Sequence, residues 1–513
     1  MEDSEIVPEI EINELIPCLC SKRWVLAYVA FVGFICLYAV RVNMSVAIVC
    51  MVRLDNSTSN TTEQDLHPTC TDDQDTQQNN NRGEFDWNKS TQSQILASFF
   101  YGYFVMQIPG GWLSGRYGAK RVIGVGLFIS ALATVLMPVC ARTRTELVYV
   151  LRVILGISSS VMFPAMQAMW GRWAPPLERS KLVGLCYAGA FLGNIITFSG
   201  SGLLCANGFD NGWGSIFYIT GGGTFLWLCM WVVVVSDSPR KHSTISEAER
   251  KYIVESIGTL TDEVKYTPWL EIFKSRAVLV CFIAHLCNNW MHYTLITGLP
   301  TFMNEVLKFD IKKNGVLSAV PYTAMLVTSI SGGQLADFLR KRFISTQNAR
   351  RLFQATSFLG SAACLVSVGF VPCEQRMLAV ALLTIAVAFE GLCNSGYMVN
   401  TVDFAPRYAG VLFGINNTIA TIPGMLAPLA IGGLTPHKSQ EEWRNVMYLA
   451  AGFCVFGAIV FGFFVKTDEE PWAIEKSMNT EFEVSPTQTD SRGNKGQINH
   501  TFQLNTDHVN TKM

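Results

Sequence analysis

The chain has 513 residues, of which 50% are hydrophobic and only 15% charged, and its formal net charge at pH 7 is -1. This balance, without any dense basic stripe, excludes a typical nucleic-acid-binding protein. The apolar residues instead form repeated runs of roughly twenty residues or more, each long enough to cross a bilayer as a helix. The composition therefore predicts an all-α protein that spans a membrane many times.

The amino-terminal tail, residues 1–23, is acidic and ends in a lysine and an arginine. Positive charge stays on the cytosolic side of a membrane, so we expect this tail in the cytosol. Its stretch EINELI matches an acidic-dileucine signal for sorting to endosomes and lysosomes, although such short patterns also arise by chance. Sorting adaptors are therefore candidate partners through Glu11, Leu15 and Ile16.

The first predicted span, residues 24–51, lacks a small-residue cleavage site, so we expect it to be retained rather than removed as a signal peptide. A polar loop follows at residues 52–91 and carries three patterns for N-glycosylation. These patterns matter only on the luminal or extracellular side, where the positive-inside argument also places the loop. The predicted acceptors are Asn56, Asn60 and Asn88.

The apolar runs predict twelve spans in two halves of six. The segments IPGGWLSGRYGAKR and SGGQLADFLRKR each join two spans through a glycine-containing turn rich in cations. Such repetition is typical of transporters built from internal repeats, although ordinary cytosolic loops also gather lysine and arginine. We expect a first half at 24–236, a hydrophilic connector at 237–276, a second half at 277–466 and a disordered cytosolic tail at 467–513.

Two arginines lie inside the predicted spans of the first half. Arg41 stands well inside the first span, and Arg152 is the only charge between Val148 and Gly171. A charge at this depth is costly and marks a functional site, although an arginine near a helix end can also snorkel to the headgroups. Counted along each helix, both fall in the luminal half of the membrane, so they predict an anion site.

The second half contributes His292 and Glu390, which fall near the midplane. An imidazole with an unperturbed pKa of about 6.5 suits a compartment that acidifies. Both residues could instead be structural, the histidine as a hydrogen-bonded core group and Glu390 as an arginine partner that joins the halves. We predict that they couple transport to protons, with Glu390 as the principal carrier, against sodium linkage or uniport driven by the membrane potential.

The chain has no Walker loop, no HExxH or cysteine–histidine zinc spacing and no GxSxG elbow. We therefore expect no enzyme activity, no metal site and no cofactor, with a proton or sodium gradient or the membrane potential as the energy source. Most of the 15 cysteines lie in apolar runs and are expected to be small core residues. Cys70 and Cys373 face the oxidising side and could pair.

Several segments of the chain resemble solute carrier family 17 of the major facilitator superfamily, most closely its sialin-like members. The resemblance covers nearly the whole chain from 24 to 472 and implies a carrier of organic anions or phosphate, with spans one, four, seven and ten lining the cavity. The four intramembrane residues fall one on each of these spans. The segments that carry the resemblance are RVNMSVAIV at 41–49, SFFYGYFVMQIPGG at 98–111, FPAMQAMWGRWAPPLERSK at 163–181, and DFAPRYAGVLFGINNT with ATIPGM within 403–425.

The resemblance implies that Arg41 and Arg152 meet the carboxylate of the substrate. We add Tyr101, Asn288 and Tyr293 to the predicted substrate-binding residues.

Some positions depart from the family pattern. Sialin-like members carry glutamates linked to proton coupling where this chain has Leu155 and Ser159. Vesicular glutamate carriers have a histidine and an arginine where Leu96 and Asn288 stand, and the span-ten histidine of both branches is Thr401 here. The resemblance therefore implies the fold and an anion preference, but neither the coupling ion nor the substrate.

The sequence predicts a secondary transporter of an organic anion, such as an acidic sugar or glutamate, working by alternating access. We expect it in a lysosomal, endosomal or synaptic-type vesicle membrane, or in the plasma membrane. One alternative is a sodium-dependent phosphate or urate transporter, and another is a transporter-like receptor that no longer transports. The expected partners are a small anion, a coupling ion and the lipid bilayer.

Overall fold

A computed structural model gives the conformation of residues 21–53, 83–175, 178–258, 267–405 and 408–473. This part of the chain is almost entirely helical, and its only β pairing is an isolated bridge between Val52 and Phe85. Ten of its helical segments are long and apolar enough to cross a membrane. The predicted all-α membrane fold is confirmed.

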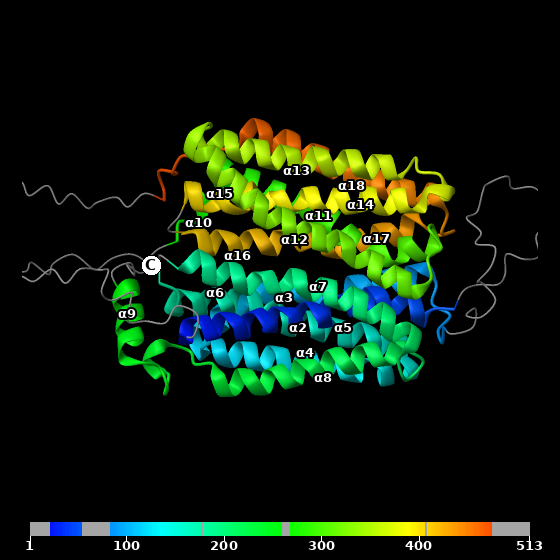
Figure 1. Ribbon diagram of the computed structural model, residues 1–513, viewed down its shortest axis with the longest axis horizontal. Helices are drawn as coiled ribbons and strands as arrows, with labels where there is room; N and C mark the ends of the chain where they lie inside the picture. Colours follow the sequence, from blue (N-terminus) through cyan, green and yellow to red (C-terminus); the bar gives the residue numbers. More distant parts are fainter. Residues whose placement is uncertain (1–20, 54–82, 176–177, 259–266, 406–407, 474–513) are drawn as a thin grey trace, which may run out of the picture. The chain divides into compact units, whose positions relative to one another are not determined.

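The first half contains six long helical segments (Figure 1). α5 and α6 follow each other across Val161 and act as one segment. The bounds are α2 (Lys22–Met51), α3 (Lys89–Tyr117), α4 (Ala119–Thr143), α5 (Thr145–Ser160), α6 (Met162–Trp173), α7 (Arg179–Asn207) and α8 (Trp213–Val234).

The second half repeats this arrangement with two interrupted segments, α14–η4–α15 and α16–α17. Two long helices, α3 and α11, are absent from the ten apolar segments because they carry more polar residues, and both line the site described below. The bounds are α11 (Arg276–Glu305), α12 (Ile311–Arg342), α13 (Thr346–Val368), η3 (Cys373–Gln375), α14 (Arg376–Glu390), η4 (Gly391–Ser395), α15 (Tyr397–Phe404), α16 (Ala409–Ile419), α17 (Ile422–Leu434) and α18 (Gln440–Phe464).

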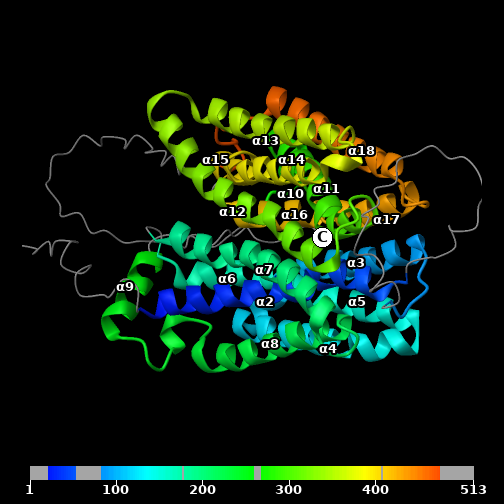
Figure 2. The ribbon, with the colours of Figure 1, turned by 45° about the vertical axis from the view of Figure 1, so that its right-hand side comes forward.

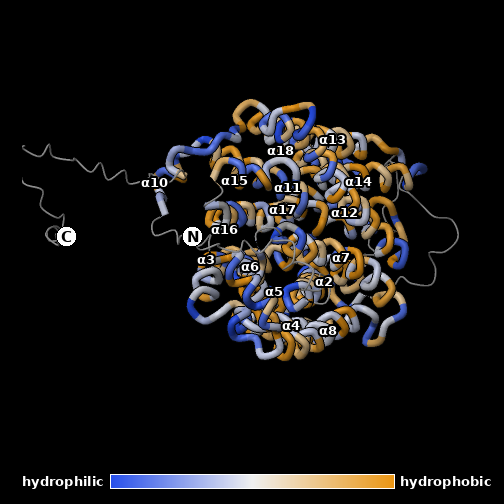
Figure 3. Tube along the Cα trace, turned by 60° about the vertical axis from the view of Figure 1, so that its left-hand side comes forward, coloured by the Kyte–Doolittle hydropathy of each residue, from blue (hydrophilic) through white to orange (hydrophobic). Residues whose placement is uncertain are grey.

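Seen nearly end-on, the helices carry many hydrophobic residues, whereas hydrophilic residues are frequent in the segments that connect them (Figure 3). The connector between the halves forms η2 (Pro239–Lys241), α9 (Glu247–Gly258) and α10 (Trp269–Lys274). We call the end of the bundle that carries α9 the connector end. The predicted disordered tail began at residue 467, but residues 467–473 are described and pack on the bundle, since the Glu470 amide donates a hydrogen bond of 2.9 Å to the Phe404 carbonyl and Ala473 is buried. Residues 474–513 and the sorting signal at 11–16 lie outside the described residues.

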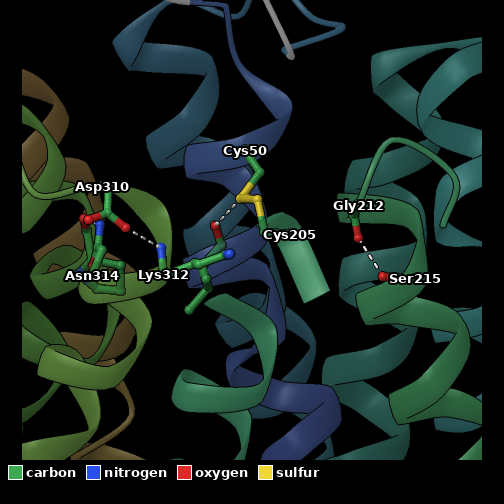
Figure 4. Close-up of a disulfide and its surroundings, with 9 residues drawn as sticks. Cys50, Cys205, Gly212, Ser215, Asp310, Lys312 and Asn314 are labelled. Carbon is green, nitrogen blue, oxygen red and sulfur yellow. Dashed lines mark hydrogen bonds between the residues drawn. A yellow bond between two sulfur atoms is a disulfide. The ribbon is translucent and has the colours of Figure 1, made fainter. Parts of the chain in front are cut away.

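The opposite end carries a disulfide between Cys50 and Cys205, which joins the end of α2 to the end of α7 (Figure 4). We call it the disulfide end. Cys281, Cys287 and Cys454 are buried, as predicted for core residues. The predicted pairing of Cys70 with Cys373 involves side chains that the structure does not describe.

At the connector end, an ion-pair cluster gives the charged loop after α6 a structural role. The Arg23 guanidinium, at the start of α2, lies 2.7 Å from the Glu178 carboxylate and 3.3 Å from that of Glu249 on α9. The arginine is almost completely buried. Three segments distant in sequence are thereby tied together beside the proline-rich WAPPLERSK stretch.

The halves meet mainly where α2, α3 and α7 pack against α11, α12 and α17 (Figure 2). Near the disulfide end, α7 and α12 touch through glycines, since a Cβ on Gly202 would lie 2.7 Å from the Gly315 Cα. Further along, the rings of Phe198 and Tyr322 stack at a centroid distance of 5.3 Å. The glycine contact between α7 and α12 closes the gap between the halves at the disulfide end.

Candidate anion site and coupling pair

Arg41 on α2 lies at the contact between the two halves. Its side chain is buried, and its Nη2 donates a hydrogen bond of 3.0 Å to the Tyr293 hydroxyl on α11. Aromatic faces attract a guanidinium, and the attraction strengthens when water is excluded. Five ring centroids lie 4.9–5.5 Å from its central carbon, those of Tyr38, Phe99, Phe100, Tyr103 and Tyr293.

Arg152 on α5 has fewer partners than Arg41. Only 2% of it is exposed, which excludes a side chain that snorkels to the headgroups. Its Nε donates a long hydrogen bond of 3.4 Å to the Ile95 carbonyl, and its Nη1 has no partner in the described structure. A buried cation that lacks a counter-ion is strongly unfavourable, so this guanidinium is prepared for a ligand.

The Phe99 ring brings the two arginines to one place. Its centroid lies 5.1 Å from the guanidinium carbon of Arg152 and 5.4 Å from that of Arg41. Close packing of α3 on α5 produces this arrangement, because Gly102 and Gly156 each face backbone of the other helix with no room for a Cβ. Neither arginine forms an ion pair within the described part of the chain.

Glu390, the last residue of α14, forms a second buried polar centre. Its Oε1 lies 2.8 Å from His292 Nδ1 and accepts a hydrogen bond of 3.4 Å from Asn288 Nδ2, both on α11. Its Oε2 has no partner among the described residues. The alternative that Glu390 pairs with an arginine to join the halves is wrong, because its partners belong to its own half.

The predicted substrate-binding residues divide between these two centres. Tyr293 bonds Arg41 and Asn288 bonds Glu390, whereas Tyr101 reaches neither centre through a described hydrogen bond or ring contact. Tyr101 is 40% exposed and shares an outward stripe of α3 with Val105 and Ile108. Helical periodicity explains this placement, since its neighbours in SFFYGYF turn inward and only one face of α3 can meet Arg41.

The positions of the missing family acids are filled by core groups. Leu155 is buried, and the buried Ser159 hydroxyl donates to the Leu155 carbonyl, so neither position holds a free titratable group. Within the described ranges, no three histidine, cysteine, aspartate or glutamate side chains gather to hold a metal.

Of the predicted glycosylation acceptors, Asn56 and Asn60 lie outside the described residues. Asn88 is exposed and caps α3, its side chain accepting a hydrogen bond of 2.8 Å from the Thr91 amide.

A buried clasp between the halves was not predicted. At the disulfide end, Lys89 Nζ of α3 lies 2.6 Å from the Glu305 carboxylate of α11, and Trp443 Nε1 donates to the same carboxylate at 3.0 Å. The two charged side chains are only 7% and 9% exposed. The sequence does place a lysine and a glutamate at the ends of two spans. Because they are 216 residues apart, nothing in the sequence shows that they pair.

Comparisons with known proteins identify the family of the chain. The family model described as Major Facilitator Superfamily matches residues 29–428. Human sialin is 42% identical over 91% of this chain and 94% of its own, and vesicular glutamate transporter 2 of Homo sapiens is 36% identical over 90% and 77%.

Among solved structures, a bacterial homologue of the human lysosomal transporter Spinster, in an inward-facing and occupied conformation, superposes with a TM-score of 0.65. It covers 87% of this chain and 97% of its own at 14% identity, which supports the fold alone. All these relatives are transporters and none is an enzyme by name. The chain belongs to the Major Facilitator Superfamily and, within it, to solute carrier family 17, the family of sialin and the vesicular glutamate transporters.

Proposed function

We propose that this protein is a secondary active transporter of organic anions that holds the anionic group of its substrate at Arg41 and Arg152. The observation that carries the proposal is a pair of buried guanidinium groups on one phenylalanine ring, with no carboxylate paired to either among the described residues. A carboxylate matches the planar fork of arginine donors and would neutralise both cations.

Arg41 and Arg152 take different parts in binding. Arg152 has an unpartnered Nη1 and is available at once, whereas Arg41 is held by Tyr293 of the other half. An anion that binds Arg41 competes with this hydroxyl. Substrate entry and exit are thereby linked to a contact between the halves, which alternating access requires to change.

The conformation described is closed at the disulfide end. The Lys89–Glu305 clasp and the glycine contact of α7 with α12 both join the halves there. We assign this end to the lumen, because disulfides persist in oxidising compartments and the glycosylation patterns precede α3 at the same end. The cytosol is then at the connector end, where the positive-inside argument also places it.

The names of the relatives point to a carboxylate substrate, either an acidic sugar or glutamate. The membrane is accordingly that of lysosomes, endosomes or vesicles, with sorting through Glu11, Leu15 and Ile16. Inorganic phosphate or urate with sodium is the second candidate, favoured by Thr401 where the relatives' branches carry histidine. Coupling to protons through Glu390 and His292 is part of the proposal, since the pair can gain or lose a proton.

The test is uptake into liposomes that contain the purified full chain. Radiolabelled sialic acid, glutamate, urate and phosphate are compared under an imposed pH gradient, an imposed sodium gradient and a membrane potential alone. We expect uptake of a carboxylate under the pH gradient. Uptake of phosphate or urate only with sodium would establish the second candidate, and no uptake of any anion would favour a receptor that does not transport.

A further inference from the structure

The break in the tenth span lies directly beside Glu390. α14 ends at Glu390, η4 continues to Ser395, and α15 begins at Tyr397, with Gly396 between them in a conformation that is neither helical nor extended (φ -96°, ψ -112°). A broken helix inside a membrane frees backbone N–H and C=O groups that water cannot satisfy. Other protein groups must therefore bond the freed backbone.

Two side chains of α13 satisfy the freed groups on each side of Gly396. Arg350 Nη1 donates a hydrogen bond of 3.0 Å to the Ser395 carbonyl, and Gln354 Oε1 accepts one of 3.1 Å from the Tyr397 amide. The two side chains are four residues apart and thus on one face of α13. They are 4% and 0% exposed, so water does not compete for these bonds.

Arg350 also fixes the far side of the break. Its Nε and Nη2 donate to the Asp403 carboxylate on α15 at 2.7 Å and 3.2 Å, a bidentate pair. One guanidinium therefore holds both η4 and α15. A bidentate charge-assisted pair is directional as well as strong, so it fixes the position of α15 on α13.

α12 holds η4 from another side. A Cβ on Gly391 would lie 2.7 Å from the Met325 carbonyl oxygen, and Asn394 Nδ2 donates to the Ser329 hydroxyl at 2.6 Å. The short segment that follows Glu390 is therefore held by two neighbouring helices in addition to its own 3₁₀ hydrogen bonds.

We propose that Arg350 and Gln354 are positioning residues, which hold the break between α14 and α15 as a hinge and thereby set where the Glu390 carboxylate lies relative to His292. The inference rests on the proposed role of Glu390 in coupling. Because the Tyr397 amide and the Ser395 carbonyl are bonded by side chains of α13, a shift of that helix can release or reset them without unwinding α14.

Glu390 faces titratable groups from several elements, and a change in its position alters its distance to all of them. In the part of the chain that the structure describes, His292 alone is within ion-pair distance of it. The others in electrostatic range are Tyr322 of α12, Cys393 of η4, Tyr397 of α15 and Cys454 of α18.

The test replaces Gln354 by methionine, which has a similar size but cannot accept the Tyr397 amide. In the purified transporter we expect amide hydrogen exchange in 391–397 to accelerate about tenfold or more, since that amide loses its bond. The midpoint of the pH dependence of uptake should move by roughly half a pH unit. Gln354→Glu keeps an acceptor and should restore slow exchange. Ser357→Ala is the matched control, because Ser357 is buried on the same helix and has no hydrogen-bond partner among the described residues.

Arg350→Lys serves as a second variant if Gln354→Met does not fold. It keeps a charge for Asp403 but cannot also reach Ser395, and the same two changes are expected. Unchanged exchange and an unchanged pH profile in either folded variant would overturn the hinge while leaving the proposed function intact. If Glu390→Gln transports with the wild-type pH profile, the coupling role and the inference built on it both fail.

Discussion

In each half, one interrupted span carries a charged residue of the candidate site, but the two interruptions differ in structure. In the first half, α5 and α6 are separated only by Val161, whose backbone stays helical. The serines before it bond carbonyls of their own helix, as Ser158 does to Leu155. In the second half, a five-residue 3₁₀ segment follows Glu390 and depends on side chains of other helices.

The charged residues on the two spans also differ, in their pairing. Arg152 lies on a nearly continuous helix and has no counter-ion among the described residues, whereas Glu390 lies at a break and is paired with His292. A rigid span with an unpaired cation suits binding, because its geometry is fixed before the anion arrives. A broken span with a paired carboxylate suits coupling, because small backbone changes reset the pair. Under the proposed function, the first half recognises the anionic group of the substrate and the second half couples transport to protons.

The largest expected effect tests the first half. Arg152→Lys and Arg41→Lys keep the charge but lose the bidentate geometry, so uptake of the anion should fall about 10- to 100-fold while folding and trafficking remain normal. Uptake into liposomes and size-exclusion profiles measure both. Arg53→Lys is the control, since its guanidinium is exposed at the surface. If both Lys variants transport the anion at the wild-type rate, neither arginine recognises it through bidentate hydrogen bonds.

The second prediction tests the coupling half. Glu390→Gln preserves the shape and the acceptor for His292 but removes the charge that a proton neutralises. With sodium absent, uptake driven by an imposed pH gradient should be lost, while exchange of labelled for unlabelled anion at equal pH should persist. Glu255→Gln, exposed on the connector, is the control. A Gln variant that the gradient drives as well as wild type would make Glu390 structural.

The third prediction concerns the clasp that closes the disulfide end. Glu305→Gln leaves Lys89 buried without its counter-ion, and removal of one partner of a buried pair costs about 3–5 kcal/mol. We expect lower thermal stability and a shift toward the state open at this end. Lys89→Met combined with Glu305→Met removes both charges and should recover much of the stability. A double variant no better than the single one would show that the ion pair itself is needed.

The sequence identified the charged residues of the site but not their partners. Arg41, Arg152, His292 and Glu390 were visible because a charge inside an apolar run has few explanations. The hydrogen-bond partners of these residues could not be predicted, because they lie on helices that are remote in sequence. Arg41 and Tyr293, for example, are 252 residues apart, and no local pattern connects them. Likewise, the aromatic run SFFYGYF does not by itself show which rings face Arg41, whereas the structure places Phe99 and Tyr103 against its guanidinium.

The disulfide was missed for a related reason. Cys50 and Cys205 lie in apolar runs, where cysteines are usually core residues, although both fall near span ends on the same side of the predicted topology. That coincidence was a usable signal. The fold was predictable because span length and repetition are properties of composition, whereas side-chain pairing between spans depends on helix rotation.

The smallest expected effect concerns acid stability at the disulfide end. Glu84 accepts hydrogen bonds from Arg142, which also pairs with Asp210, and the Arg142 guanidinium lowers the pKa of the Glu84 carboxyl. A carboxyl whose folded pKa is depressed contributes stability above its unfolded pKa and loses that contribution as the pH falls through the folded value. The Glu84 cluster should therefore remain charged in an acidic lumen of about pH 5, above the ordinary glutamate range.

Because this cluster is partly exposed, its contribution is about 1 kcal/mol or less. Melting temperatures of wild type and Glu84→Gln, measured from pH 7 down to pH 4, should differ by a small and constant amount to about pH 5 and converge below it. Disulfide reduction is avoided in these samples, so that Cys50–Cys205 contributes equally to both proteins. A difference that disappears between pH 7 and pH 6 would contradict the depressed pKa and would mean that acidic compartments weaken this end of the first half.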